Sequence, residues 1–179
     1  DAFSVSFKDD AGWTHEAVVL DFEMERADEG AAALDDIKAP LEEAFRAVVS
    51  GEAESDGFNR LVLCAGLAWR DVTILRAVTK YLRQAAINFS QDYIEHALGR
   101  NPDIARLLVE LFHTANDPSD NEKRDARLRL VQTRIDKALN DVPSLDDDRI
   151  IRRIRNVIAN VLRTNYYQHN EDGTARPVF

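Results

Sequence analysis

The sequence contains a single cysteine, Cys64, among 179 residues. One thiol cannot close an intramolecular disulfide or complete a thiolate metal site, so disulfide-stapled domains are excluded and a reducing compartment is indicated. Glycine and proline are also scarce, with 7 and 5 residues, together about 7% of the chain against roughly 12% in an average protein. This shortage of turn-forming residues favours long regular elements, and helices in particular.

Positive charge is in deficit, because 23 lysines and arginines oppose 32 acidic residues and leave a formal net charge of −9. Such a balance argues against nonspecific binding to nucleic acid. No apolar run approaches the ~18 residues of a membrane span, and the opening residues lack the basic and apolar regions of a secretory signal. We therefore expect a cytoplasmic protein with neither nucleic acid nor membrane as a partner.

The first 25 residues carry the period of two that is typical of strands. Phe3, Val5 and Phe7 alternate with serines, residues 18–24 alternate in the same way, and residues 9–12 supply a turn. An isolated hairpin is marginally stable in water, and no later segment predicts a third strand. Either this hairpin packs on the helices that follow, or its partner strands lie upstream.

From residue 35 onward the apolar residues recur every three or four positions, which predicts helices. The expected helices are 35–49, 58–67, 69–86, one capped by Ser90, one that Asn101-Pro102-Asp103 begins and Asp117-Pro118 ends, 121–141 and 145–163. The fold class is therefore mainly α, an N-terminal β-hairpin followed by a bundle of about six or seven helices. Residues 169–179 are polar and are expected to form a loop.

The helix at 69–86 shows the clearest apolar stripe. It contains Trp69 and Val72 and continues to either Tyr81 or Leu82. If Trp69 is buried in the bundle, truncating it to alanine would cost about 3 to 5 kcal/mol. Arg76 and its basic neighbours at 80 and 83 share another face, which we expect to be solvated.

Glu110 and His113 form an E-x-x-H pair, the unit that carboxylate-bridged dimetal bundles use. Such sites need a second copy, and the sequence has none. His15 and His96 have no partner at metal-ligand spacing, so we expect them to be solvated or locally hydrogen-bonded. Cys64 lies in an apolar run and is expected to pack in the core. No metal-binding residue is therefore predicted.

The sequence contains no G-x-G-x-x-G, Walker A or G-x-S-x-G motif. No catalytic or cofactor-binding residue is therefore predicted. The densest basic cluster comprises Arg149, Arg152, Arg153 and Arg155. It could grip phosphates or meet missing parts of the chain, but acidic residues three and four positions earlier favour a salt-bridged face.

Tyr166 and Tyr167 follow the last expected helix. Two adjacent aromatic rings could stack on a ligand. The plainer interpretation is that they pin the chain as it leaves the bundle.

Several stretches together carry a family pattern, in a constant order from about residue 40 to the C-terminus. They are Phe58-Asn59-Arg60-Leu61-Val62-Leu63, Ala65-Gly66-Leu67, Trp69-Arg70, Lys80-Tyr81-Leu82-Arg83-Gln84, Phe89-Ser90-Gln91, Tyr93-Ile94, Ile104-Ala105-Arg106-Leu107-Leu108-Val109-Glu110-Leu111-Phe112, Asp148-Arg149-Ile150, Arg152-Arg153 and Leu162-Arg163-Thr164-Asn165-Tyr166-Tyr167-Gln168. As a set they resemble the large bacterial NAD-specific glutamate dehydrogenases.

The resemblance implies a fragment of a far longer, cytoplasmic and homo-oligomeric oxidoreductase of amino-acid catabolism. In that family ACT-type modules come first, a helical region follows, and the NAD-binding catalytic domain lies toward the C-terminus. We accordingly expect residues 1–50 to end an ACT-like module, 51–168 to form a helical domain, and 169–179 to lead toward the absent catalytic domain. The family's catalytic lysine and glycine-rich motif fall outside these residues.

The main prediction is thus a non-catalytic helical or regulatory segment, which has no cofactor of its own and whose parent uses NAD. The parent would oxidatively deaminate L-glutamate to 2-oxoglutarate. One alternative is an amino-acid effector-binding or subunit-interaction module near the hairpin, whose open edge could pair with another copy. Another is a helical scaffold for an unrelated partner.

Overall fold

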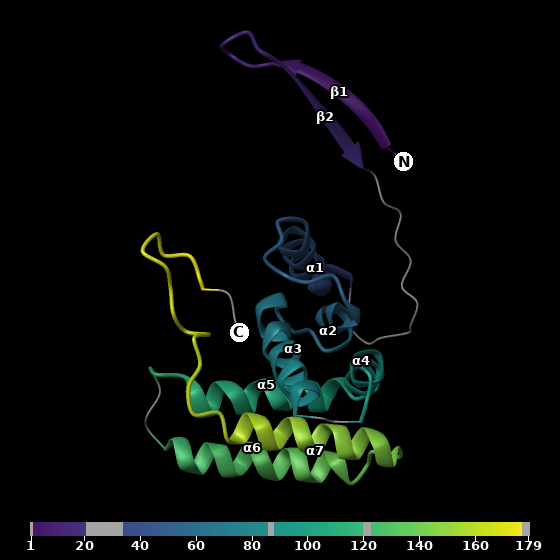
Figure 1. Cartoon of the computed structure of the whole chain (residues 1–179), viewed down its shortest axis with the longest axis vertical. Coiled ribbons are helices and arrows are strands. Elements are labelled where there is room, and N and C mark those ends of the chain that lie inside the picture. Colours follow the sequence, from purple (N-terminus) through teal and green to yellow (C-terminus); the bar gives the residue numbers. More distant parts are fainter. Residues whose placement is uncertain (1, 21–33, 86–87, 120–122, 177–179) are drawn as a thin grey trace. The chain divides into compact units, whose positions relative to one another are not determined.

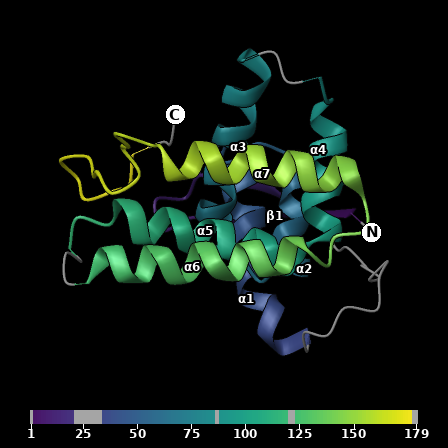
Figure 2. The ribbon, with the colours of Figure 1, turned by 90° about the horizontal axis from the view of Figure 1, so that it is seen from below.

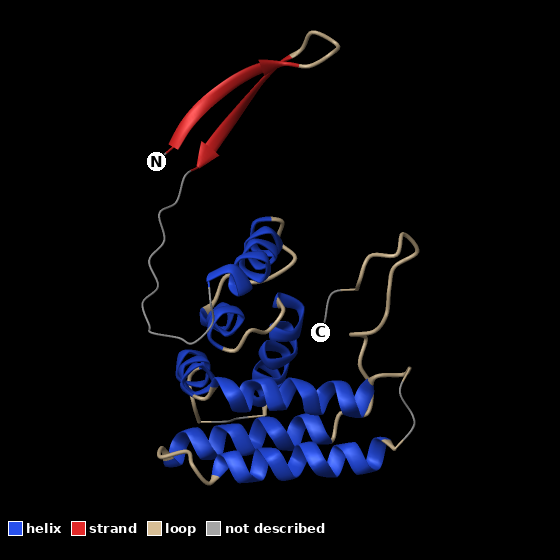
Figure 3. Ribbon diagram, turned by 180° about the vertical axis from the view of Figure 1, so that it is seen from behind, coloured by secondary structure: helices blue, strands red, loops and turns tan. Residues whose placement is uncertain are grey.

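A computed structural model describes residues 2–20, 34–85, 88–119 and 123–176 (Figure 1). The chain separates into two compact units, Asp1–Ala31 and Ala32–Phe179, and each is described by itself. The described ranges contain one two-stranded sheet, seven α-helices and one short 3-10 helix. Figure 3 shows that the strands belong to the N-terminal unit and the helices to the second. The prediction of a mainly α fold with an N-terminal hairpin is confirmed.

The first unit is an antiparallel hairpin of β1 (Ala2–Lys8) and β2 (Thr14–Leu20). Its register places Val5 opposite Ala17 and Phe7 opposite His15. In the turn the Asp9 carboxylate accepts hydrogen bonds from the backbone N–H groups of residues 11 and 13, at 3.0 and 2.9 Å. The predicted continuation of the second strand through residues 21–25 lies outside the described residues.

The second unit is built from short and medium helices joined by tight connections. They are α1 (Leu34–Val49), η1 (Gly57–Asn59), α2 (Arg60–Cys64), α3 (Trp69–Gln84), α4 (Gln91–Arg100), α5 (Pro102–Asn116), α6 (Arg124–Leu139) and α7 (Leu145–Ala159). Ser90 caps α4 as predicted, since its hydroxyl accepts from the N–H of Tyr93 at 3.1 Å. Ser144 caps α7 in the same way, through the N–H of Asp147 at 3.2 Å. Such caps satisfy backbone donors that the first helical turn leaves unpaired.

The predicted single helix over 58–67 is wrong in detail, because the segment divides into η1 and α2 and then bends. Gly66 has φ of +62°, a left-handed conformation that glycine adopts without the steric cost of a Cβ atom. The N–H groups of Ala65 and Leu67 both bond the Leu61 carbonyl, which closes the end of α2. A Cβ at Gly66 would meet no atom within 4 Å, so this glycine serves the bend and not a close helix contact.

The position of α1 differs from the predicted grouping of residues 1–50. Its contacts are with α2 and α3, and Ala44 belongs to the same buried cluster as those helices. The helix α1 therefore belongs to the helical unit. Pro40 lies inside α1, in its second turn, because α1 begins at Leu34.

The core of the helical unit lies where α5 packs against α6 and α7, with α3 and α4 also contacting α7. Figures 1 and 2 show α5, α6 and α7 running alongside one another. Leu108, Ile135 and Ile154 have no exposed surface. On α3 the inward residue is Leu82, since Tyr81 is 57% exposed. Trp69 is half-buried and packs on the edge of the core, so the large truncation cost expected for full burial does not apply.

Candidate functional site

Two tyrosines after α7 are hydrogen-bonded to side chains of α3 and α5. The Tyr166 hydroxyl donates to Oδ1 of Asp71 at 2.8 Å. The same oxygen lies 2.8 Å from Nε2 of His113, whose Nδ1 is 2.7 Å from the Tyr167 hydroxyl. If the neutral ring donates from Nε2, Nδ1 can accept from Tyr167. We call Asp71, His113, Tyr166 and Tyr167 the tyrosine clamp.

Aromatic contacts and an arginine strengthen the tyrosine clamp. The Phe112 and Tyr166 rings meet edge to face at 5.5 Å between centroids, a favourable aromatic geometry. The Arg70 guanidinium lies 4.8 Å from the centre of the Tyr166 ring. It also donates to the backbone carbonyls of Tyr166 and Arg176, at 2.6 and 3.2 Å. The tyrosine clamp and Arg70 thus hold the segment after α7, the clamp at the two tyrosines and Arg70 at the carbonyls of Tyr166 and Arg176. The predicted pinning role of the tyrosines is confirmed.

The tyrosine clamp shifts the acidity of its members. Burial opposes ionisation of Asp71, but the hydrogen bonds from His113 and Tyr166 outweigh it and lower the pKa of this carboxyl. Burial, followed by the bond to Asp71, raises the pKa of Tyr166. Burial, followed by the nearby carboxylates of Asp117 and Asp71, raises the pKa of Tyr167 to about 12. The cluster therefore favours an ionised Asp71 and neutral tyrosines.

We predict that Tyr167→Phe reduces the unfolding free energy by about 0.5 to 1.5 kcal/mol at neutral pH, because it removes one partly buried hydrogen bond. The Tyr167 pKa is raised from its ordinary value of 10.0 to about 12 in the folded chain. Its stabilising contribution is therefore present below pH 10 and is lost as the pH rises through 12. Urea unfolding from pH 7 to 11 should show the gap between wild type and variant narrowing. A gap independent of pH would contradict the prediction, and the exposed Tyr81→Phe is the control.

A second polar connection joins α4 to the start of α7. Arg100 donates to both carboxylate oxygens of Asp147, at 2.7 and 3.0 Å. Asp147 is 2% exposed, and Asn101 adds a longer contact of 3.3 Å. The hydrogen bonds from Arg100 hold the pKa of Asp147 below its ordinary value, and the bonds to Asp147 raise the pKa of Arg100. The buried carboxylate thus stays ionised and fixes α4 against α7.

A third polar contact, the buried ion pair of Arg76 and Asp56, corrects the sequence analysis. Arg76, predicted to be solvated, is 4% exposed. Its guanidinium donates to both oxygens of Asp56, at 2.6 and 2.8 Å, and to Oδ1 of Asn59 at 2.9 Å. The segment before η1 lies against this face of α3, and Asp56 in this segment contacts Arg76. The neighbouring Lys80 is half-exposed and pairs with Glu54.

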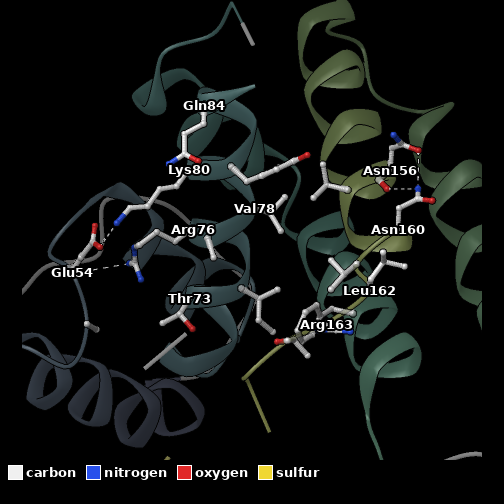
Figure 4. Close-up of a pocket in the computed structure, with 18 of the residues that line it drawn as sticks. Glu54, Thr73, Arg76, Val78, Lys80, Gln84, Asn156, Asn160, Leu162 and Arg163 are labelled. Carbon is white, nitrogen blue, oxygen red and sulfur yellow. Dashed lines mark hydrogen bonds and ion pairs between the residues drawn. The ribbon is translucent and has the colours of Figure 1, made fainter. Parts of the chain in front are cut away.

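A groove of about 1020 Å³ lies between α3 and the end of α7. Figure 4 shows Val78 of α3 and Leu162, from the segment after α7, beside this space. Apolar residues from both sides line it, while Asn156 and Asn160 provide amides near one end. Leu162 is 94% exposed. The lining mixes apolar residues with charged ones such as Glu54, Lys80 and Arg163, a composition and a size that suit an amphipathic polypeptide better than a small apolar ligand.

The E-x-x-H pair does not form a metal site. Glu110 accepts two hydrogen bonds from Arg134 at 2.7 and 2.8 Å, while His113 joins the tyrosine clamp. Across the described residues, no group of three histidine, cysteine or acidic side chains is placed to hold a metal ion. His15 lies 2.8 Å from Asp9, and Nδ1 of His96 lies 2.7 Å from the backbone carbonyl of residue 92. The local interpretation of these two histidines is confirmed.

The arginine cluster on α7 forms the salt-bridged face that was predicted. Arg152 donates to both oxygens of Asp148 at 2.9 Å. Arg149 lies 3.5 Å from an oxygen of Asp146. Arg155 pairs with Asp136 of α6, and Arg153 is exposed. Cys64 is partly buried and packs against the core, as predicted.

Sequence reasoning missed the acidic partners in three buried contacts: Asp56, Asp71 and Asp147. Asp71 and its tyrosine partner are 95 positions apart, so no local spacing relates them. Asp147 lies in the first turn of α7, and this position indicates only the favourable electrostatics of an acidic residue at a helix N-terminus. Arg76 lies at helical spacing from Val72 and Thr79, which are both buried in the structure, and this spacing was the one available signal.

None of the helices that the structure describes is both long and apolar enough to cross a lipid bilayer.

Comparison with known proteins divides the chain in two. Residues 53–118 match the family "Glutamate dehydrogenase, helical motif 3", and residues 134–179 match "Bacterial NAD-glutamate dehydrogenase, catalytic domain". The tyrosine clamp and the Arg100–Asp147 and Arg134–Glu110 pairs therefore link one matched region to the other. The second match begins within α6, well before the predicted approach to the catalytic domain at residue 169.

Curated relatives agree with these matches. The NAD-specific glutamate dehydrogenase of Halomonas elongata is 40% identical over 171 residues, which cover 96% of this chain and 10% of that protein. The Pseudomonas aeruginosa protein of the same name is 45% identical over 143 residues, 78% of this chain and 9% of the relative. The Mycobacterium tuberculosis protein of the same name is 41% identical over 137 residues, which cover 75% of this chain and 8% of that protein. The chain, which spans about a tenth of the length of these relatives, belongs as one segment to the family of large bacterial NAD-specific glutamate dehydrogenases.

Proposed function

We propose that this chain is the non-catalytic helical segment of an NAD-dependent glutamate dehydrogenase. The parent protein would oxidise L-glutamate to 2-oxoglutarate and ammonia while NAD is reduced. In this proposal the helical segment connects regulatory modules to the catalytic domain. The parent would be a cytoplasmic homo-oligomer, with its remaining domains as the partners of this segment.

The observation that carries the proposal is the tyrosine clamp. It ties Asp71 and His113, within the helical-motif match, to Tyr166 and Tyr167, within the catalytic-domain match. The two matched regions also share one buried core through the contacts of α5 with α6 and α7. A movement of the helical motif would therefore carry the leading part of the catalytic region with it, which is the property that a connector needs.

Two buried acidic side chains of this chain are engaged in ion pairs that stabilise the fold. The buried carboxylates of Asp56 and Asp147 are each bonded to an arginine. The sequence also lacks the glycine-rich loops that cradle the phosphates of a dinucleotide. We therefore assign no catalytic residue and no cofactor of its own to this segment.

We predict that the purified 179-residue chain produces no glutamate-dependent NADH and shows no tight binding of NAD. NADH absorbance and calorimetric titration measure these two properties, and the full-length protein provides the positive control for both. Glutamate-dependent turnover by the purified chain would overturn the assignment.

A second candidate function, amino-acid effector binding, rests on the hairpin. Among the described residues β1 and β2 pair with each other in a two-stranded sheet, which leaves an outer edge on each strand. Val5 and Phe7, on one face, are 41% and 52% exposed. Strands of an ACT-like module, or of a second copy, would pair with these outer edges and extend the sheet. Calorimetric titration with a panel of amino acids tests the candidate, because a purely architectural segment gives no heat.

A further inference from the structure

The groove between α3 and the end of α7 has one wall from each of the two matched regions. Val78 and Tyr81 lie on α3, within the helical-motif match, while Val161 and Leu162 lie within the catalytic-domain match. The groove is therefore continuous with the interface that the tyrosine clamp secures. An occupant would contact both regions at once and brace their relative position.

The shape and chemistry of the groove suit a helix with an apolar ridge. Residues 73, 77, 81 and 84 line one side of it at helical spacing, and two of them, Thr73 and Ala77, are small. Small side chains allow a neighbouring helix to approach closely. Tyr81 and Leu162, which both line the groove, are 57% and 94% exposed. Exposed apolar side chains beside a hollow are typical of a protein docking surface.

The path of the chain indicates which polypeptide fills the groove. Arg70 binds the carbonyl of Arg176 at 3.2 Å, and Arg70 lies one helical turn before Thr73, which lines the groove. Chain that continues beyond residue 176 therefore starts about one turn from one end of the groove. In the three relatives the matching region is 8 to 10% of the protein, so ample polypeptide exists outside it.

We propose that a helix from the same polypeptide, in the catalytic region that follows residue 179 in the full-length protein, docks in this groove. This inference rests on the proposed function. The docked helix places its apolar ridge against Val78, Tyr81 and Leu162. Arg163, at the same rim, favours an acidic residue on the flank of the helix.

Photo-crosslinking of the full-length protein tests the proposal. Benzoylphenylalanine replaces Tyr81, a conservative aromatic exchange at an exposed position, and cross-linked peptides are identified by mass spectrometry. Equal parts of isotope-labelled and unlabelled subunits distinguish bonds within one chain from bonds between copies. We expect a cross-link within one chain to a peptide that follows residue 179. A cross-link to a second copy, to a peptide before this segment, or to none would overturn the proposal.

Two matched variants control the experiment. Leu162→Asp places a charge in the groove, whereas Leu130→Asp places one at a position of α6 that is 60% exposed and does not line the groove. In the 179-residue chain both should leave the melting temperature unchanged, because both side chains face water. In the full-length protein Leu162→Asp should abolish the Tyr81 cross-link and Leu130→Asp should retain it. Equal cross-linking in both variants would overturn the docking site, whereas the proposed function fails only if the isolated chain turns over glutamate.

Discussion

Replacing Asp56 with alanine is expected to lower the unfolding free energy by about 3 to 5 kcal/mol, the usual cost of breaking a buried ion pair. The side chains of Arg76 and Asp56 are only 5% and 12% exposed, so the guanidinium would remain buried without its counter-charge. Asp56 also accepts a hydrogen bond from the N–H of Phe58 at 3.1 Å and so caps η1. Chemical denaturation measured by circular dichroism gives the free energy.

Two further variants show whether the uncompensated charge causes the loss. Asp148→Ala breaks the exposed pair with Arg152 and should cost no more than about 1 kcal/mol. The double variant Asp56→Ala with Arg76→Met removes both charges, and we expect it to be more stable than Asp56→Ala alone. A single Asp56→Ala variant that loses less than about 1 kcal/mol would show that the pair is not buried in solution.

Truncation of Ile154 to alanine should cost about 2 to 5 kcal/mol, through lost burial and the cavity that remains. Ile154 has no exposed surface and lies on α7, which contacts α3, α4 and α5. The cavity therefore opens between the helical-motif match and the catalytic-domain match. Because both regions share this core, we expect a single cooperative unfolding transition at lower denaturant concentration, and not separate transitions of two parts.

Leu145→Ala is the matched control for this prediction. It removes a leucine from the first turn of the same helix, where the side chain is 64% exposed. Its free energy of unfolding should stay within about 0.5 kcal/mol of the wild type. Two resolved transitions in the Ile154 variant would contradict the shared core, and so would equal losses in the two variants.

The helices were largely predictable because each buries one face, and burial imposes a period of three to four residues. Ile104, Leu107 and Leu111 follow this period and are buried. The division of residues 58–67 into η1 and α2 was less accessible to prediction, because a short apolar segment does not reveal whether it forms one helix or two. Ile151 is buried although it lies outside the stripe that Ile150 and Ile154 form at a spacing of four, so the buried face of α7 is wider than this period alone indicates.

The polar contacts were harder to predict than the core. Asp148 and Arg152 lie four positions apart on one helix, so the sequence alone indicates their pair. The tyrosine clamp instead assembles Asp71, His113 and Tyr166 from separate elements, and only the tertiary fold brings them together. The sequence indicated that the tyrosines pin the chain, but it carried no information about their partners.

The bond between Arg100 and Asp147 has an evolutionary consequence. The two residues lie on opposite sides of the interval between residues 118 and 134, where one family match ends and the next begins. A crossover between diverged genes in that interval would pair an arginine from one ancestor with a helix start from another. A chimera joined in that interval would take Arg100 and Asp147 from different parents. We therefore expect recombination to yield folded proteins more often when the exchanged gene fragment encodes both residues.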